Sequence, residues 1–104
     1  MIARVWRGWA ADEGAADAYQ RHYETEVGEH LQQVPGFRGA RLLRGRDGGE
    51  ILFTSITYFD GMDAVRGFAG DDPGLAVVEE DARRVLSRWD ERVAHHEVAV
   101  AIGG

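Results

Sequence analysis

Four side chains suited to acid–base chemistry recur at helical spacing in the segment YQRHYETEVGEH, residues 19–30. On a wheel of about 100° per residue they lie within about 60° of one another; they are Tyr19, Tyr23, Glu26 and His30. Histidine exchanges a proton near neutral pH and a glutamate four residues earlier can contact it, so His30 and Glu26 form a candidate catalytic pair. The tyrosines add apolar rings with polar tips, which suits the wall of a ligand cavity. The same stripe also suits a core face whose hydroxyls reach the rim, so both interpretations stay open.

Other reactive groups are scarce or badly placed for a metal or a nucleophile. His22 and His30 lie about 12 Å apart along a helix, which is too far for one zinc ion. His95 and His96 are neighbours in an expected strand and point to opposite faces. Cysteine and lysine do not occur, which excludes thiolate ligands and lysine Schiff bases. We therefore expect neither a protein-ligated metal nor another cofactor.

The size and charge of the chain narrow the remaining possibilities. Its 104 residues suit one domain, which removes roughly 65% of the unfolded surface from water. The formal net charge of −6 at pH 7 argues against a nucleic-acid partner. No apolar stretch reaches the roughly 18 residues of a membrane span and no signal peptide opens the chain, so we expect a cytoplasmic protein without a membrane partner.

The elements that must position these side chains follow the order β-α-β-β-α-β. Hydrophobic periodicity and turn residues predict strands over 1–9, 37–44, 51–59 and 92–102, and helices over 13–33, 61–69 and 75–89. Asp12 and Asp60 are expected N-caps, and the Asp-Gly pair in GRDGGE favours a hairpin between the second and third strands. This order is that of the split-βαβ, ferredoxin-like unit, an α+β fold with an antiparallel four-stranded sheet.

The third expected strand, ILFTSITYF, has two faces suited to burial. Helices can cover only one face of such a sheet, so a second copy of the chain, packed sheet against sheet, is the simplest cover for the other. We therefore expect a homodimer. The alternative is that Thr54, Ser55 and Thr57 leave one face wet.

Four short stretches are distributed over nearly the whole length of the chain: MIARVWRGW, VPGFRGARLLR, YFDGMDAVRGFAGDD and VAHHEV. Together they resemble the antibiotic-biosynthesis-monooxygenase family of the dimeric α+β barrel superfamily. The resemblance implies ferredoxin-like protomers whose sheets pair into a barrel, with a pocket between the sheet and the helices of each protomer. It also implies either cofactor-independent oxygenation of an aromatic or polyketide-like molecule or haem degradation.

The chain departs from the residue patterns of both kinds of family member. The quinone-forming members use an asparagine, a tryptophan and a tyrosine, and the haem-degrading members use an asparagine, a tryptophan and a histidine. The corresponding positions here hold Ser55, Phe59 and Val65 for the first kind, and Arg7, Phe68 and Val78 for the second. Asparagine occurs nowhere in the chain, so neither set of residues carries over.

The resemblance implies a pocket whose wall joins the helical stripe to the sheet; its expected residues are Arg7, Trp9, Tyr19, Tyr23, Ser55, Phe59 and Phe68. In such a pocket, a buried His30 held by Glu26 would deprotonate an electron-rich aromatic substrate, whose carbanion would pass an electron to oxygen. Three functions remain open: a cofactor-independent monooxygenase-type enzyme, a non-catalytic small-molecule-binding or accessory module, and a structural dimer with a filled core.

Overall fold

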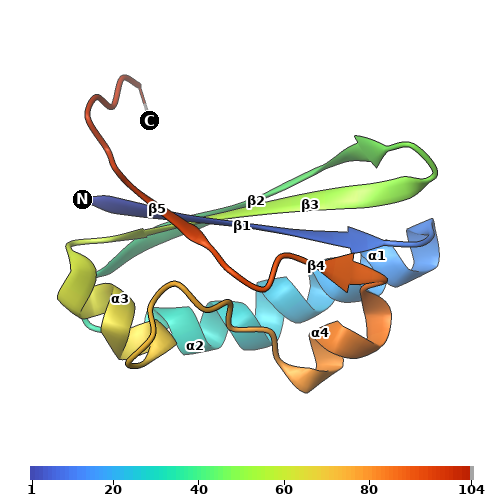
Figure 1. Cartoon of the computed structure of the whole chain (residues 1–104), viewed down its shortest axis with the longest axis horizontal. Coiled ribbons are helices and arrows are strands. Elements are labelled where there is room, and N and C mark those ends of the chain that lie inside the picture. Colours follow the sequence, from blue (N-terminus) through green and yellow to red (C-terminus); the bar gives the residue numbers. More distant parts are fainter. Residues whose placement is uncertain (104) are drawn as a thin grey trace.

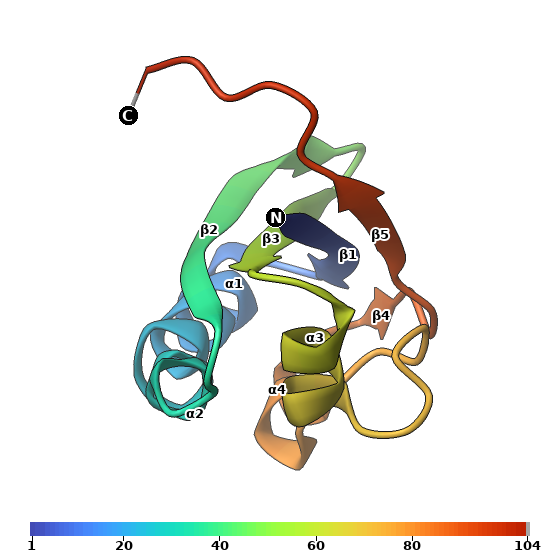
Figure 2. The same cartoon turned by 90° about the vertical axis from the view of Figure 1, so that its left-hand side faces the viewer.

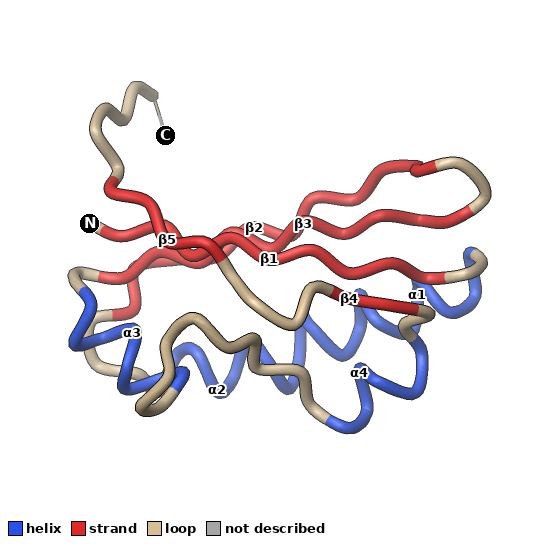
Figure 3. The backbone as a smooth tube through the Cα atoms, in the orientation of Figure 1, coloured by secondary structure: helices blue, strands red, loops and turns tan. Residues whose placement is uncertain are grey.

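One antiparallel sheet, covered by helices on a single face, forms the architecture (Figure 1, Figure 3). The computed structural model describes residues 1–103. In chain order the elements are β1 (Ile2–Ala10), α1 (Glu13–His22), η1 (Tyr23–Val27), α2 (Gly28–Gln32), β2 (Phe37–Asp47), β3 (Glu50–Phe59), α3 (Met62–Ala69), α4 (Glu80–Val85), β4 (Arg88–Trp89) and β5 (Ala94–Glu97). The predicted α+β fold is confirmed. No helix within residues 1–103 is long and apolar enough to cross a membrane.

Strand β1 lies at the centre of the sheet. The strand order is β2-β3-β1-β4, and β5 also pairs with β1, which gives five strands where four were expected. In the β1–β3 register, Trp6 lies opposite Ser55 and Arg4 lies opposite Thr57. Because residues opposite each other in a ladder share a face, these four side chains turn together toward the helices. Figure 2 shows the curved sheet with the helices gathered beneath it.

The long helix predicted over residues 13–33 is present, with an irregular turn inside it. It begins after Asp12, whose carboxylate accepts a hydrogen bond from the Ala15 amide, as predicted for an N-cap. In η1 the amide of Gly28 bonds to the carbonyl of Tyr23, five residues back, and α2 then resumes the ordinary pattern. This π-helical turn contains one extra residue. Every side chain beyond it is therefore rotated by about 100° from its place on an uninterrupted α-helix.

Two apolar clusters fill most of the space between the sheet and the helices. The larger contains Phe53 together with Tyr19 and Tyr23. The smaller contains Leu31 and Phe59, among others. Val27, the last residue of η1, packs against both clusters, so the two meet at the π-helical turn.

The helix predicted over residues 75–89 is reduced to α4. Leu75 instead forms an isolated bridge with Arg92, and residues 88–89 pair with β1 as β4. These pairings are made with distant parts of the chain, so they override the local helical spacing. The expected cap at Asp60 is also wrong: Gly61 occupies the cap position of α3, and the Asp60 carboxylate pairs with Arg38.

The last strand is shorter than the predicted span of 92–102. Its partner β1 begins at Ile2, and the last backbone hydrogen bond between the two segments is donated by the Val98 amide to the Met1 carbonyl. Beyond that point the chain has no partner strand to follow. It leaves the sheet on the side away from the helices, with Val100 and Ile102 exposed (Figure 1).

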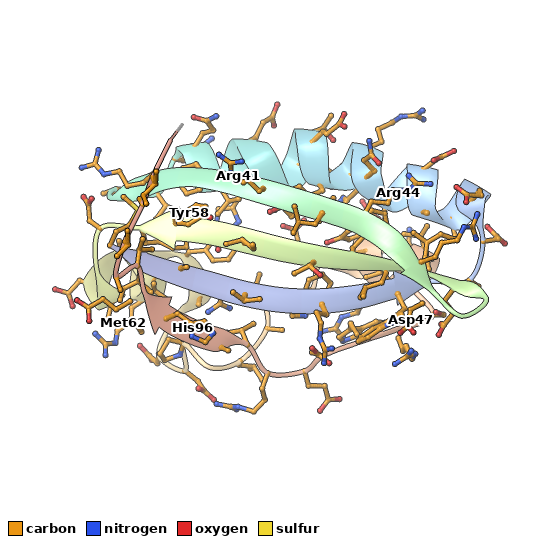
Figure 4. All side chains as sticks on the ribbon, turned by 90° about the horizontal axis from the view of Figure 1, so that it is seen from above. Arg41, Arg44, Asp47, Tyr58, Met62 and His96 are labelled. Carbon is orange, nitrogen blue, oxygen red and sulfur yellow. The ribbon has the colours of Figure 1, made fainter. Side chains whose placement is uncertain are left out.

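The face of the sheet opposite the helices is uncovered in the single chain. Figure 4 looks onto this face, where Arg41 of β2, Tyr58 of β3 and His96 of β5 lie. Ile56 is half-buried there, and Leu43 is 49% exposed. Both faces of β3 therefore carry apolar side chains, as the sequence predicted.

Candidate functional site

A cavity opens between the sheet and the helices at the meeting point of the two clusters. The residues of its wall that can take part in chemistry or ring stacking are Arg4, Trp6, Tyr19, His22, Tyr23, Ser55, Phe68 and Glu79. Its water-accessible volume is about 50 Å³, which admits a few water molecules at roughly 10–15 Å³ each. The interior is therefore not completely filled. A ring-sized ligand needs the wall to yield, and residues 77–79 together with Val93 form the part of the wall outside any helix or strand.

Four of the seven expected pocket residues line this cavity; they are Tyr19, Tyr23, Ser55 and Phe68. Phe59 is fully buried in the smaller apolar cluster instead. Arg7 and Trp9 lie on the uncovered face of the sheet. There Arg7 forms an ion pair with Asp90, and the Trp9 indole donates a hydrogen bond to Asp47.

The expected contribution of β1 is thus displaced by three positions along the strand, an odd number that changes the face. Side chains alternate between faces, so the cavity receives Arg4 and Trp6 while Arg7 and Trp9 point away from it. The sequence MIARVWRGW carries an arginine and a tryptophan on each face. Alternation alone therefore could not identify the inner face, and only the pairing with β3 decides it.

The π-helical turn divides the predicted helical stripe. The two tyrosines before or at its start are buried, as predicted. Glu26 within the turn and His30 beyond it are exposed. After the rotation of about one residue, the buried Leu31 occupies the direction expected for His30. His30 instead packs its ring against that of the wall residue Phe68, with the ring centroids 5.1 Å apart.

His22 is the histidine that faces the cavity. Its side chain is 7% exposed, and its Nδ1 lies 3.0 Å from Oε2 of Glu26. An ionised carboxylate can only accept a hydrogen bond, so Nδ1 carries the proton and Nε2 is the free acceptor. Within residues 1–103 this buried Nε2 has no hydrogen-bond partner, and the nearest carboxylate oxygen, on Glu79, is 3.7 Å away. An oriented basic nitrogen between two carboxylates is well placed to take up a proton.

Hydroxyl groups from the helix and the sheet meet at the cavity wall. The Tyr23 and Ser55 hydroxyls lie 2.8 Å apart. Burial raises the pKa of Tyr19 and of Tyr23 above the ordinary value, although the contact with Ser55 opposes this effect at Tyr23. Both phenols therefore stay protonated at neutral pH and can donate hydrogen bonds to an oxygen atom of a ligand.

One group of side chains has the composition of a cation site. His22, Glu26 and Asp81 each offer one ligand atom, and these atoms lie within 4.8 Å of one another. Both carboxylates are exposed, and each already has a protein partner: Glu26 pairs with His22, and Asp81 with Arg84. The group is thus complete as an ion-pair cluster, and its geometry does not call for a metal.

No protein-family model and no curated protein significantly matches the chain, whereas solved structures do. The monooxygenase ActVA-Orf6 of Streptomyces coelicolor, in complex with nanaomycin D, matches with a TM-score of 0.69 and 19% identity over 99% of this chain and 91% of that one. The chain has the fold of these monooxygenases. SnoaB, a cofactor-independent oxygenase from Streptomyces nogalater, matches with a TM-score of 0.64 and 13% identity over 99% and 97% of the two chains.

The heme-degrader MhuD from Mycobacterium tuberculosis, with two hemes bound in its active site, also matches. Its TM-score is 0.65, with 18% identity over 99% of this chain and 100% of that one. The resemblance expected from the sequence is thus confirmed at the level of the fold. Identities this low leave the reaction and the ligand to be argued from the site of this chain.

Proposed function

We propose that the chain is a cofactor-independent, monooxygenase-type enzyme that acts on a small aromatic or polyketide-like molecule held in the cavity. The observation that carries the proposal is the buried, unpaired Nε2 of His22, oriented from the other side by Glu26. The reaction class is supported by the shared fold with ActVA-Orf6 and SnoaB, whose names describe a monooxygenase and an oxygenase. In this proposal His22 takes the role that the sequence suggested for His30.

In the proposed reaction, His22 removes the proton of the substrate's hydroxyl group, which leaves a negative charge shared between that oxygen and an electron-rich ring carbon. This anion passes one electron to oxygen, and the resulting radical pair combines to form a carbon–oxygen bond at the ring carbon. The oxygen–oxygen bond then breaks as the single proton of that carbon leaves. One oxygen atom remains as a new carbonyl group, and the other leaves as water with both protons. The hydroxyls of Tyr19 and Tyr23 stabilise the negative charge on the substrate oxygen before the electron leaves.

We also propose that two copies of the chain pair through the uncovered faces of their sheets. The apolar side chains of that face, among them Leu43, Ile56 and Tyr58, support this arrangement. The exposed tail residues Val100 and Ile102 leave the sheet on the same side and would gain apolar contacts with a second copy.

Oxygen uptake with 1-naphthol as substrate tests the enzymatic proposal, because its product, 1,4-naphthoquinone, requires one oxygen molecule and releases one water. We expect His22→Gln to lower turnover by roughly 10²–10⁴-fold, as removal of a general base does. His30→Gln is the matched comparison, since it makes the same change at the histidine outside the cavity. Loss of turnover in His30→Gln with retention in His22→Gln would reverse the assignment of the base.

A binding function without chemistry is the second candidate. It is favoured by Ser55, which occupies the position where the quinone-forming members of the family that the sequence resembles have an asparagine. The Ser55 hydroxyl is also already hydrogen-bonded to Tyr23. Calorimetry with 1-naphthol separates the two candidates. Binding without oxygen uptake supports the binding module, and binding with oxygen uptake supports the enzyme.

A further inference from the structure

Arg4 is a buried cation without a carboxylate partner. Its side chain projects from β1 into the cavity wall, and the residue is 4% exposed. The guanidinium donates to the backbone carbonyls of Pro73 and Leu75, and it lies 3.1 Å from Nε2 of His95. All of these partners are neutral acceptors when His95 is unprotonated. Within residues 1–103 no ion pair neutralises this charge.

Several arginines at the surface of the same chain, unlike Arg4, have carboxylate partners. Arg7 and Arg92 lie at the surface and pair with Asp90 and Asp72, respectively. Exposed cations can rely on water, whereas a buried cation loses that solvation and needs a counter-charge. This loss of solvation affects Arg4: burial lowers the pKa of its guanidinium to about 10. Arginine nevertheless remains charged at neutral pH, so the Arg4 end of the cavity keeps a positive charge without an ion-pair partner.

The cavity carboxylate does not supply the missing negative charge. Glu79 lies beside Nε2 of His22, at 3.7 Å, and makes no ion pair with Arg4. His95 cannot serve either, because an imidazole is neutral or positively charged; burial and the nearby charge of Arg4 lower its pKa and favour the neutral ring. A ligand that enters the cavity is therefore the available source of a counter-charge.

The position of Arg4 fits one end of an aromatic ligand. Its guanidinium carbon lies 5.7 Å from the centroid of the Phe68 ring. A charged ligand group bound to Arg4 therefore has an aromatic face beside it. Arg4 lies opposite Thr57, two residues along β3 from Ser55 and its partner Tyr23. Two residues of a strand span about 7 Å, roughly the length of one aromatic ring with its substituents.

We propose that the cavity selects an aromatic carboxylate, with its carboxylate group on Arg4, its ring beside Phe68 and its opposite edge at the Tyr23–Ser55 hydroxyls. This inference rests on the proposed function only in taking the same cavity as the ligand site. A guanidinium binds a carboxylate through paired N–H groups, which no neutral substituent reproduces. The ligand then completes the charge pairing that the protein leaves open.

Isothermal titration calorimetry with 1-hydroxy-2-naphthoate and 1-hydroxy-2-naphthamide tests this selection on two probes of equal ring size. The wild-type chain is expected to bind the carboxylate roughly 10- to 100-fold more tightly than the amide, as expected for a charge-assisted hydrogen bond. Equal affinity for the two compounds, or failure to bind either of them, would overturn the inference. This comparison needs no variant, so a folding defect in a variant cannot rescue the inference.

Variants then locate the preference. Arg4→Met is expected to abolish it and Arg4→Lys to retain part of it, because lysine keeps the charge without the planar fork. Arg38→Met is the matched control: Arg38 is exposed and pairs with Asp60 outside the cavity. A full preference in a folded Arg4→Met variant would contradict the assignment to Arg4.

The outcome for this inference is separable from that for the enzymatic proposal. A preference for the carboxylate, with no oxygen uptake on 1-naphthol or on 1-hydroxy-2-naphthoate, supports the anion site and contradicts the oxygenase. Oxygen uptake on 1-naphthol with equal affinity for acid and amide supports the oxygenase and contradicts the anion site.

Discussion

The imidazole of His22 joins the inside of the protein to its surface: Nδ1 lies 3.0 Å from Oε2 of the exposed Glu26, and Nε2 is buried at the cavity. The ring is held between η1 and the segment leading into α4. A proton taken from a ligand at Nε2 can therefore leave through Nδ1 to a carboxylate in contact with water, without movement of the ring. This relationship makes the tautomer of His22 the first property to measure.

Glu26→Gln is expected to remove the fixed tautomer. A carboxylate only accepts, whereas an amide can donate or accept, so the variant no longer restricts the proton to Nδ1. Imidazole nitrogen chemical shifts, measured by NMR at a pH where the ring is neutral, should show the Nδ1–H form in the wild type and a mixture in Glu26→Gln. Glu29→Gln, an exposed change on the same helix, should keep the wild-type pattern. A wild-type ring protonated at Nε2 would contradict the predicted orientation.

Loss of one hydroxyl from the Tyr23–Ser55 pair is expected to destabilise the fold. Tyr23→Phe leaves the buried Ser55 oxygen without its partner, at a cost of about 1–3 kcal/mol in the free energy of unfolding. The double variant with Ser55→Ala should cost less than the sum of the two single changes, because no unpaired group remains. Denaturant unfolding of all four proteins gives the coupling free energy. Tyr58→Phe, on the uncovered face, serves as the control; additive effects at the pair would argue against the bond.

Stability is expected to fall at alkaline pH because of Tyr19. Burial raises its pKa above the ordinary value, so the unfolded chain ionises first, near pH 10. The stabilising difference is complete below about pH 10 and is lost as the pH rises toward the folded-state pKa, by up to about 1.4 kcal/mol per pH unit. Arg4, with its lowered pKa, contributes in the opposite direction, and this contribution is common to wild type and variant. Urea unfolding at pH 8 and pH 11 should show a smaller loss in Tyr19→Phe than in the wild type. Parallel losses in the two proteins would mean that Tyr19 is not the titrating group.

The proposed homodimer predicts that a charge on the uncovered face separates the chains. Leu43→Glu places a carboxylate among apolar side chains that the second copy would cover, so we expect the variant to elute as a monomer in light-scattering chromatography. Leu75→Glu is a matched control, because Leu43 and Leu75 are both 49% exposed but only Leu43 lies on the uncovered face. Wild-type chain that is already monomeric, or dissociation by Leu75→Glu alone, would remove the sheet-to-sheet arrangement.

Local signals in the sequence were sufficient for most of the fold. Asp12 caps the helix it was expected to cap, and Gly48 supplies the positive φ of 62° in the predicted hairpin. Two faces suited to burial were also predicted for β3, and both carry apolar side chains. By contrast, the path of residues 75–79 depends on Leu75, whose carbonyl is bound by Arg4 and which bridges Arg92. Contacts with such distant partners leave no pattern in the local sequence.

The site was harder to predict than the fold, for two physical reasons. The first is that β1 carries similar residues on both faces, so Arg4 and Trp6 were indistinguishable from Arg7 and Trp9 before the pairing was known. The second is the π-helical turn, which moved His30 outward. The sequence YETEV contains no proline or glycine that would mark such an irregularity.

The π-helical turn also acts as a one-residue insertion within the helix. Deleting a single residue between Tyr23 and Gly28 would restore an ordinary helix, and Leu31 would keep its place in the core. Straightening the turn without a deletion would instead bring His30 into that place. Alignments that forbid a one-residue gap inside a helix will therefore match the wrong residues on one side of this turn, and designs copied from them will inherit the error.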